Sequence, residues 1–363
     1  MSLELIIKGV IVGGMFLLAF LNFSNAIRVN RRANIWFGFF VLLWSTFWLD
    51  EMIFPDNVFP NITINILFRF VQFLVPLSFL ISVFFYTNPQ YKLKTKDYLL
   101  FLLPLAFLGV LIIGKGNPQG YNKTILMMLF FVQALLCTVL AYLKVRKHQK
   151  VIQSFSSSTL NIDLRWIKYI IYSCTISSIL ILIYNLLFPE SNLNTIINMF
   201  FLAVLYLVAF YSMRQGEIYP KGIDVEETLD MADEDEGDRT ELKIKLLSDE
   251  ELAVYKEKLS QLMIQEELFL DSELNSLKLA NHLGITIHQL SYIINSGFGM
   301  NFFQFINRYR VDKAKELLLD EAMMPYNMIS IGYASGFNSK TAFNTVFKNV
   351  TGQTPSEFRN SRK

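Results

Sequence analysis

The chain has 363 residues, of which 53% are hydrophobic and only 18% are charged, and its mean hydropathy is +0.36. A soluble protein of this length would carry more charge, so the composition excludes an ordinary soluble globular protein. The net charge of +2 is a cancellation between regions, since residues 1–215 hold 17 Lys/Arg against 7 Asp/Glu, residues 216–250 hold 4 against 13, and residues 251–363 hold 12 against 11. The total charge therefore says nothing about partners.

Seven stretches of residues 1–215 are apolar and long enough to cross the hydrocarbon core of a bilayer, which needs about 20 residues. The fourth stretch is the weakest, because it is short and contains Pro104. Residues 1–25 lack a basic n-region and a small-residue cleavage motif, so we expect the first stretch to be a permanent helix. The predicted spans are Leu5–Ile27, Ala33–Phe54, Ile62–Tyr86, Tyr98–Ile113, Ile125–Leu143, Trp166–Phe188 and Ile196–Met213.

Basic residues fall in alternate loops between these spans. The first, third and fifth loops are rich in Lys and Arg, and Arg214 follows the last span, whereas the even loops carry few basic residues. The positive-inside rule then places the N-terminus outside and the C-terminus in the cytoplasm, and only a count of seven spans preserves the alternation. The sequence predicts a multi-pass protein of the inner membrane.

Three charged residues lie inside predicted spans, where charge is costly and often functional. Asp50 and Glu51 lie near the outer end of the second span, and Arg69 lies about two turns into the third. One interpretation makes them a ligand site of a membrane sensor. The other is an interhelical ion pair, or side chains that reach the membrane interface.

The membrane half has no recognisable catalytic motif. HExxH, Gly-x-Ser-x-Gly and phosphate-binding glycine loops are absent from residues 1–215. The two cysteines lie in apolar runs and the three histidines do not cluster, which argues against a disulfide framework or a metal site. We therefore expect no catalytic residue, no metal and no cofactor, and a protein that is not an enzyme.

Residues 216–247 are acidic and poor in apolar residues, so we expect a flexible linker. An alternative is an acidic strand that competes with DNA phosphate for a neighbouring basic face. Ser248 and Glu251 then form a capping box that opens an amphipathic helix. Its apolar stripe either packs on the following domain or pairs with another chain; the stripe consists of Leu252, Tyr255, Leu259, Leu262 and Met263.

A first helix-turn-helix pattern follows. Leu277, Ala280 and Leu283 give one helix an apolar face, Gly284 can adopt the left-handed turn, and Thr286 can cap the next helix. That second helix would bury Leu290, Ile293 and Ile294. Its exposed side would present His288, Gln289, Ser291, Tyr292 and Asn295.

A long amphipathic helix over 302–319, about 27 Å at 1.5 Å per residue, separates this pattern from a second one. Its predicted inward residues are Phe303, Ile306, Ala314, Leu317 and Leu318. In the second pattern Ile329, Ile331 and Ala334 face inward, Gly336 turns, Asn338 or Ser339 caps, and Phe343 and Phe347 bury the second helix. Its exposed side would present Lys340, Thr341, Asn344 and Thr345, with Lys348 placed for a phosphate contact.

Two such patterns, joined by a long helix and closed by Gly352-Gln-Thr-Pro-Ser-Glu-Phe-Arg359, resemble the AraC-type DNA-binding domain over about residues 255–360. The resemblance implies two helix-turn-helix units that enter successive major grooves of double-stranded DNA. By position, the family's base-facing places are His288, Ser291, Tyr292, Lys340, Thr341, Asn344 and Thr345. The chain departs from the family in two ways. It has no arginine on these faces, and it has membrane helices where the family usually has a soluble sugar-binding domain.

The expected fold is thus all-α, with a seven-transmembrane-helix bundle over 1–215, the linker over 216–247 and a cytoplasmic all-helical DNA-binding domain over 248–363. The expected function is a bacterial membrane-anchored one-component transcription regulator, whose bundle senses a small ligand or membrane signal and which acts as a homodimer on a promoter. Two alternatives are a transporter or membrane enzyme with a regulatory appendage, and a pure membrane tether that senses nothing.

Overall fold

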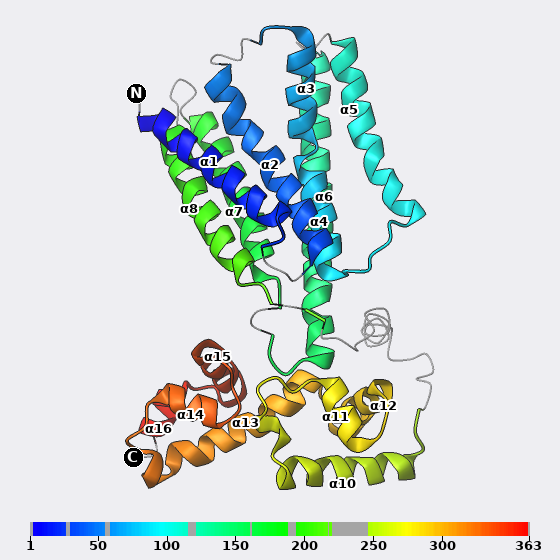
Figure 1. Ribbon diagram of the computed structural model, residues 1–363, viewed down its shortest axis with the longest axis vertical. Coiled ribbons are helices and arrows are strands. Elements are labelled where there is room, and N and C mark those ends of the chain that lie inside the picture. Colours follow the sequence, from blue (N-terminus) through cyan, green and yellow to red (C-terminus); the bar gives the residue numbers. More distant parts are fainter. Residues whose placement is uncertain are drawn as a thin grey trace. The chain divides into compact units, whose positions relative to one another are not determined.

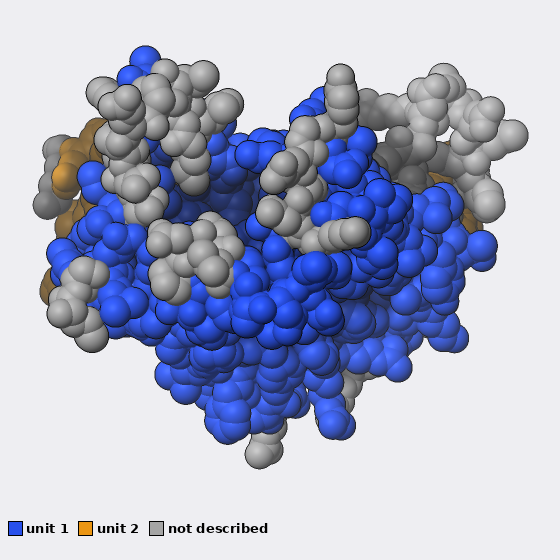
Figure 2. All heavy atoms as spheres, turned by 90° about the horizontal axis from the view of Figure 1, so that it is seen from above, with its two compact units in different colours: residues 1–148, 164–217 blue, residues 149–163, 218–363 orange. Residues whose placement is uncertain are grey.

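The computed structural model describes residues 3–26, 30–54, 59–114, 121–159, 162–187, 194–216, 218–219 and 246–361. These residues are almost wholly helical, and their only β-type pairing is one isolated bridge between Ser156 and Asn275. The chain divides into two compact units, coloured separately in Figure 2. Unit 1 comprises residues 1–148 and 164–217, and unit 2 comprises residues 149–163 and 218–363. Most of the predicted linker, residues 217 and 220–245, lies outside the described residues.

Unit 1 contains the seven predicted spans, and each of them is helical (Figure 1). Six segments within the described residues are long and apolar enough to cross a membrane, and the predicted span 166–188, whose described part lies in the helix α7, is not among them. The helices are α1 (Leu3–Phe23), α2 (Arg31–Ile53), α3 (Ile62–Phe73), α4 (Val75–Thr87), α5 (Leu102–Ile113), α6 (Tyr121–Phe155), α7 (Arg165–Leu187) and α8 (Asn194–Met213).

Two prolines explain local departures from straight helices. The third predicted span is divided at Leu74 into α3 and α4, because Pro76 lies in the first turn of α4 and has no N–H to donate to the preceding turn. Pro104 lies near the start of α5, where a missing N–H costs little, and a 3₁₀ segment η2 (Thr95–Phe101) precedes it. The weak fourth span is therefore a 3₁₀–α succession.

Helix α6 is longer than predicted. The apolar span ends near Leu143, but the helix continues through a basic stretch to Phe155, giving 35 residues or about 52 Å. Its residues from Gln149 onward belong to unit 2. The basic residues after Leu143, which the sequence places in a loop, thus form the polar end of the same helix.

Unit 2 has two apolar cores arranged along one helix, α13 (Phe302–Leu319) (Figure 1). The first half of α13 contributes Phe302, Phe305 and Ile306 to the first core, and the second half contributes Val311, Ala314 and Leu318 to the second. The other elements are α10 (Asp249–Gln265), η3 (Leu268–Leu270), α11 (Ser276–Leu283), α12 (Ile287–Tyr292), η4 (Ile293–Gly297), η5 (Glu321–Met323), α14 (Met328–Ala334), α15 (Lys340–Thr351) and α16 (Pro355–Asn360).

The apolar stripe of α10 packs on the first core. Leu259 and Met263 are fully buried there, and Leu252, Tyr255 and Leu262 lie against the same core. Of the two interpretations of this stripe, packing on the neighbouring domain therefore accounts for it. The capping box of Ser248 and Glu251 is present, with Glu251 N donating to Ser248 Oγ at 3.1 Å.

Candidate nucleic-acid interface

The first helix-turn-helix unit is formed by α11 and α12. Asn275 caps α11, with its side-chain oxygen 2.9 Å from Lys278 N, and Gly284 makes the turn at φ +69°. Thr286 and Gln289 form a capping box at the start of α12. The local signals therefore determine this unit, since each turn and cap lies within four residues of the helix that it bounds.

Four of the five predicted contact residues lie on α12 and the fifth, Asn295, lies on η4, and all five are half-buried. Gln289 Oε1 already accepts from Thr286 N at 3.0 Å, so this side chain serves first as a cap. Tyr292 packs against the first core, and Asn295 Nδ2 lies 3.4 Å from Ser291 Oγ. The first unit thus offers a polar surface, with His288 and Ser291 in the middle of α12.

The second unit, formed by α14 and α15, presents a more open surface. Ser339 caps α15, with its Oγ 3.1 Å from Ala342 N, while Phe343, Val346 and Phe347 are buried. Lys340, Thr341, Thr345 and Lys348 are exposed and Asn344 is half-buried. Across the described parts of the chain, the side chains of Lys340, Thr341, Asn344 and Thr345 make no hydrogen bond or ion pair, which leaves their polar groups available to a ligand.

Two expectations for this domain need correction. Ala334 is exposed, because α14 ends there and the chain turns away at Ser335 and Gly336. Phe303 is only partly buried, and Phe302 and Phe305 take the inward positions of α13. A helix that serves two cores has inward residues on more than one side, so a single apolar stripe mispredicts them.

A buried arginine, which the sequence reading did not single out, lies between the two cores. Arg310 is 1% exposed, and its Nε donates to Phe269 O at 2.7 Å. Its Nη2 donates to Asp271 O at 2.8 Å and to Ser157 Oγ at 3.0 Å, and its Nη1 donates to Ser157 O at 3.2 Å. Burial lowers the pKa of this guanidinium to about 10, although Asp271 and Glu273 act in the opposite direction, so the group stays charged at neutral pH.

Residues 149–159, the end of α6 and the four residues after it, belong to unit 2, and Ser157 contacts this arginine. Ser157 Oγ donates to Leu274 O at 2.6 Å, and Asn307 Nδ2 donates to Ser157 O at 3.1 Å. Ser156 pairs with Asn275, the cap of the first unit, and Asn338 Nδ2, in the turn of the second unit, donates to Ser158 Oγ at 2.8 Å. Three consecutive serines therefore contact both helix-turn-helix units. No signal within these serines identifies them, because their partners lie more than 100 residues away.

The three charged residues proposed as a sensor site do not form one cluster of contacts. Gln72 Nε2 donates to Asp50 Oδ2 at 2.8 Å, and Arg69 Nε donates to Asn65 Oδ1 at 2.6 Å. Glu51 pairs instead with Lys8 of α1, with 2.8 Å between Oε2 and Nζ. Within the described residues, no ion pair joins Arg69 to Asp50 or Glu51. The three residues remain candidates, with separate partners.

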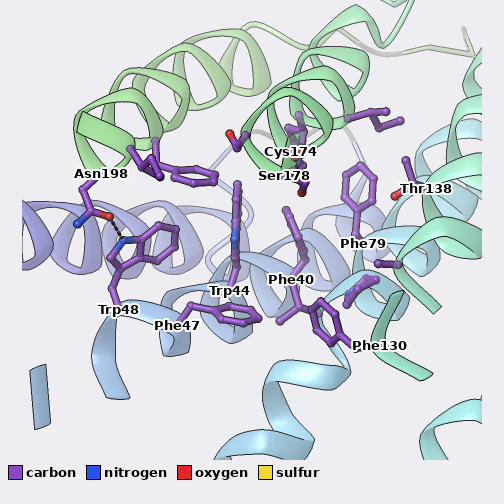
Figure 3. Close-up of a pocket in the computed structure, with 18 of the residues that line it drawn as sticks. Phe40, Trp44, Phe47, Trp48, Phe79, Phe130, Thr138, Cys174, Ser178 and Asn198 are labelled. Carbon is purple, nitrogen blue, oxygen red and sulfur yellow. Dashed lines mark hydrogen bonds between the residues drawn. The ribbon is translucent and has the colours of Figure 1, made fainter. Parts of the chain in front are cut away.

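Unit 1 also contains a cavity of about 510 Å³, partly open at its surface, between α2, α4, α6, α7 and α8 (Figure 3). Glu51 borders it, whereas Asp50 and Arg69 are not among its lining residues. Aromatic rings form much of its wall. We found no signal for this cavity in the sequence, because its lining comes from five separate helices.

Two families match different parts of the chain. Residues 279–361 match the family described as helix-turn-helix domain, and residues 4–155 match the family described as 7TM diverse intracellular signalling. Among curated relatives, the arabinose operon regulatory proteins of Escherichia coli (strain K12) and Salmonella typhimurium are each 33% identical over 89 residues, 24% of this chain and 30% and 31% of their own length.

An uncharacterized HTH-type transcriptional regulator of Staphylococcus aureus (strain COL) is 29% identical over 106 residues, which is 29% of this chain and 14% of that protein. This chain therefore spans less than a third of each of these relatives. A solved structure of a protein of unknown function from Listeria innocua is 30% identical and covers 30% of this chain and 96% of its own, with a TM-score of 0.26.

Proposed function

Because residues 279–361 form an AraC-type helix-turn-helix domain that follows a seven-transmembrane domain, we propose that the chain is a membrane-anchored one-component transcription regulator. It binds promoter DNA through both helix-turn-helix units, and its membrane bundle senses a signal. It acts by binding and not by catalysis. The alternation of basic loops supports an inner-membrane orientation with the N-terminus outside and the DNA-binding domain in the cytoplasm.

The observation that carries this proposal is the position of the serines between α6 and α7. Ser156 and Ser158 contact the first and second helix-turn-helix units, and Ser157 contacts the buried arginine between their cores. Residues 149–163 connect two transmembrane helices directly, so a rearrangement of those helices reaches these contacts through the peptide chain itself. A pure tether would need no such contact.

The mechanism is a shift between two arrangements of the DNA-binding domain. A signal must stabilise one arrangement of the bundle more than the other, because equal affinity for both shifts nothing. When residues 156–158 hold Asn275 and Asn338, they fix the turn of the second unit relative to the cap of the first. Release of these contacts changes the spacing between α12 and α15, the second helices of the two units, and this change alters the affinity for DNA.

The low net charge of the domain supports dimerisation. Residues 251–363 carry 12 Lys/Arg against 11 Asp/Glu. The predicted DNA-contact residues of the two units, called here the reading faces, include no arginine. Phosphate contacts supply much of the affinity for DNA, so one copy binds weakly and two copies double the contacts. We therefore include a homodimer on a two-part promoter site in the proposal.

The experiment begins with genome-wide mapping of DNA crosslinked to the full-length protein in its native membrane. We expect discrete peaks with a shared two-part motif, and loss of those peaks in the double variant Lys340→Ala with Asn344→Ala. The matched control, Lys315→Ala with Gln261→Ala, removes one exposed ammonium and one exposed amide away from the reading faces, and should keep the peaks. Unchanged peaks in the reading-face variant would contradict the assignment of α15.

The sensing part has a separate test. A reporter placed behind a mapped promoter is compared between the native chain and a chimera in which an unrelated membrane anchor replaces residues 1–214. We expect the native chain to change its output between growth conditions and the chimera to lose that change. Equal responses would reduce the bundle to a tether. Transport or turnover by reconstituted residues 1–215, without any mapped promoter, would favour the transporter or enzyme alternative.

A further inference from the structure

The cavity of unit 1 has the size of a site for a small molecule. Its volume of about 510 Å³ falls within the range of ligand pockets, roughly 300–1,000 Å³. An apolar cavity of roughly 150 Å³ is large enough for one benzene ring, so this cavity has room for about two or three rings. Protein interiors otherwise leave few voids larger than a water molecule.

Rigid aromatic rings shape the cavity. Trp44 and Phe40 of α2 project toward the helix that carries Cys174 and Ser178 (Figure 3). The rings of Trp44 and Phe40 are 5.2 Å apart and tilted by 25°. At another part of the wall, Trp48 and Phe201 meet edge to face at 5.3 Å. Flat ring faces and edges held at fixed angles suit a planar aromatic guest, which can stack or pack edge to face with them.

The cavity has one charged residue at its border. Among the described lining residues, Glu51 alone carries a formal charge, and the Lys8 ammonium lies 2.8 Å from its carboxylate and 2.7 Å from that of Glu4. The rest of the described lining offers no counter-ion, so a charged guest among the aromatic rings would lose its hydration without compensation. This observation favours an uncharged ligand.

On the α6 side of the wall, one polar side chain has no hydrogen-bond partner. The Thr138 hydroxyl makes no hydrogen bond within the described residues, whereas the Ser177 and Ser178 hydroxyls of α7 donate to carbonyls of their own helix at 2.7 and 2.8 Å. The Thr138 side chain is half-buried, so its O–H can donate to an acceptor on a ligand, and such a hydrogen bond stabilises the bound state. A guest with a carbonyl or ether oxygen supplies this acceptor.

Thr138 lies on the helix that continues into unit 2. Phe130, Ala134 and Thr138 of α6 border the cavity, and the same unbroken helix ends at Phe155, two residues before Ser157. A ligand in the cavity thus contacts the helix whose far end leads to the serines that hold the DNA-binding domain.

We propose that the cavity binds an uncharged aromatic compound of about two or three rings that carries one hydrogen-bond acceptor, such as an aromatic ketone, and that Thr138 donates to this acceptor. The assignment rests on the proposed sensing function for its biological meaning, but binding itself does not depend on DNA. The competing occupant is a phospholipid acyl chain, which is flexible, has no acceptor and makes no use of Thr138.

Benzophenone is the probe, because it is uncharged, has two rings joined by a carbonyl, and couples to nearby C–H bonds when irradiated. The full-length protein is placed in phosphatidylethanolamine–phosphatidylglycerol nanodiscs, irradiated with benzophenone, and mapped by peptide mass spectrometry. We expect saturable labelling of cavity residues of α2, α6 and α7. Ala134→Trp, which places a two-ring side chain in the cavity, should strongly reduce it, while Leu135→Trp on a 67% exposed neighbouring residue should not.

The isosteric variant Thr138→Val tests the hydrogen bond and avoids a large change in packing. The benzophenone concentration for half-maximal labelling should rise about two- to tenfold, which is the effect of one neutral hydrogen bond. With benzophenone held well below half-saturation in both proteins, the concentration of diphenylmethane that halves the labelling should stay the same, since this competitor has the two rings without the carbonyl. Equal sensitivity of the two compounds to the variant would overturn the role of Thr138.

The remaining outcomes test whether the cavity is the binding site and which molecule occupies it. Labelling confined to lipid-facing residues, or labelling that survives Ala134→Trp, overturns the site. Cavity labelling in short-chain detergent but not in nanodiscs means that an acyl chain occupies the cavity, which overturns the aromatic ligand. Because no DNA is present, these results stand whether or not the promoter mapping supports a regulator, and a failed regulator with intact labelling would leave the site in place.

Discussion

The substitution Ser157→Ala isolates the contact between residues 149–163 and the DNA-binding domain. It removes the hydroxyl that donates to Leu274 O at 2.6 Å and accepts from Arg310 Nη2 at 3.0 Å, both in a buried setting. A neutral hydrogen bond contributes about 0.5–1.5 kcal/mol and one to a charged group about 1.5–3 kcal/mol. Because Nη2 keeps Asp271 O at 2.8 Å, we expect the lower part of the combined range, about 2–3 kcal/mol.

The assay is hydrogen exchange of the full-length protein in nanodiscs, followed on peptides that contain residues 150–159. If these residues open locally, a loss of about 2–3 kcal/mol lowers their protection about 30- to 150-fold. The control is Ser154→Ala, whose hydroxyl donates at 2.7 Å to Val151 O of its own helix. Equal protection in the two variants would refute the reasoning, because the Ser157 hydroxyl would then contribute no more than an ordinary helix serine.

Three other predictions concern unit 2. In the full-length protein, Gly336→Ala should lower the melting temperature of the DNA-binding domain far more than Gly284→Ala. Both glycines have a positive φ, but only at Gly336 would a Cβ lie 2.4 Å from Phe269 O. Similar melting shifts for the two variants, as expected if each lost only the roughly 1–2 kcal/mol of a left-handed alanine, would contradict this. Hydrogen bonds from Thr354, backbone first, lower the pKa of Glu357, so its stabilising effect is present above pH 4.5 and is lost as the pH falls through the lower folded value. The melting temperatures of the wild type and Glu357→Gln should therefore differ above that pH and converge in acid, and a constant difference would argue against the cap. Lys348→Ala should reduce the slope of log K against log salt by about one while leaving sequence preference unchanged, as measured by titration of a mapped promoter, whereas a changed base preference would mean that Lys348 contacts a base.

The local features of the fold were predictable from the sequence because their causes are local. The bounds of α13 were predicted correctly, since Asn301 caps its start and the apolar spacing continues to Leu319. The capping boxes and the turns at Gly284 and Gly336 were predicted for the same reason. Length and hydropathy predict six of the seven spans directly, because these two properties are read from each segment by itself.

Contacts between distant segments could not be predicted in this way. Arg310 lies on a helix in a polar sequence context and reads as an exposed cation, yet it is buried because Phe269, Asp271 and Ser157 supply oxygen acceptors from two other segments. The end of α6 was misplaced because its basic residues resemble a loop on a hydropathy scale. The outward side of α15 could be predicted from the spacing of its apolar residues alone, whereas the use of Gln289 as a cap on α12 appears only in three dimensions.

The position of Arg310 between two cores has a consequence for how the DNA-binding domain melts. Its donors satisfy three backbone carbonyls, so the loss of either core removes the packing that holds the guanidinium and strands those carbonyls without partners. A domain with two separate cores on one helix would ordinarily melt in two calorimetric steps. Because Arg310 joins the two cores, they should unfold together in a single transition. Helices α12 and α15 should then unfold at the same temperature.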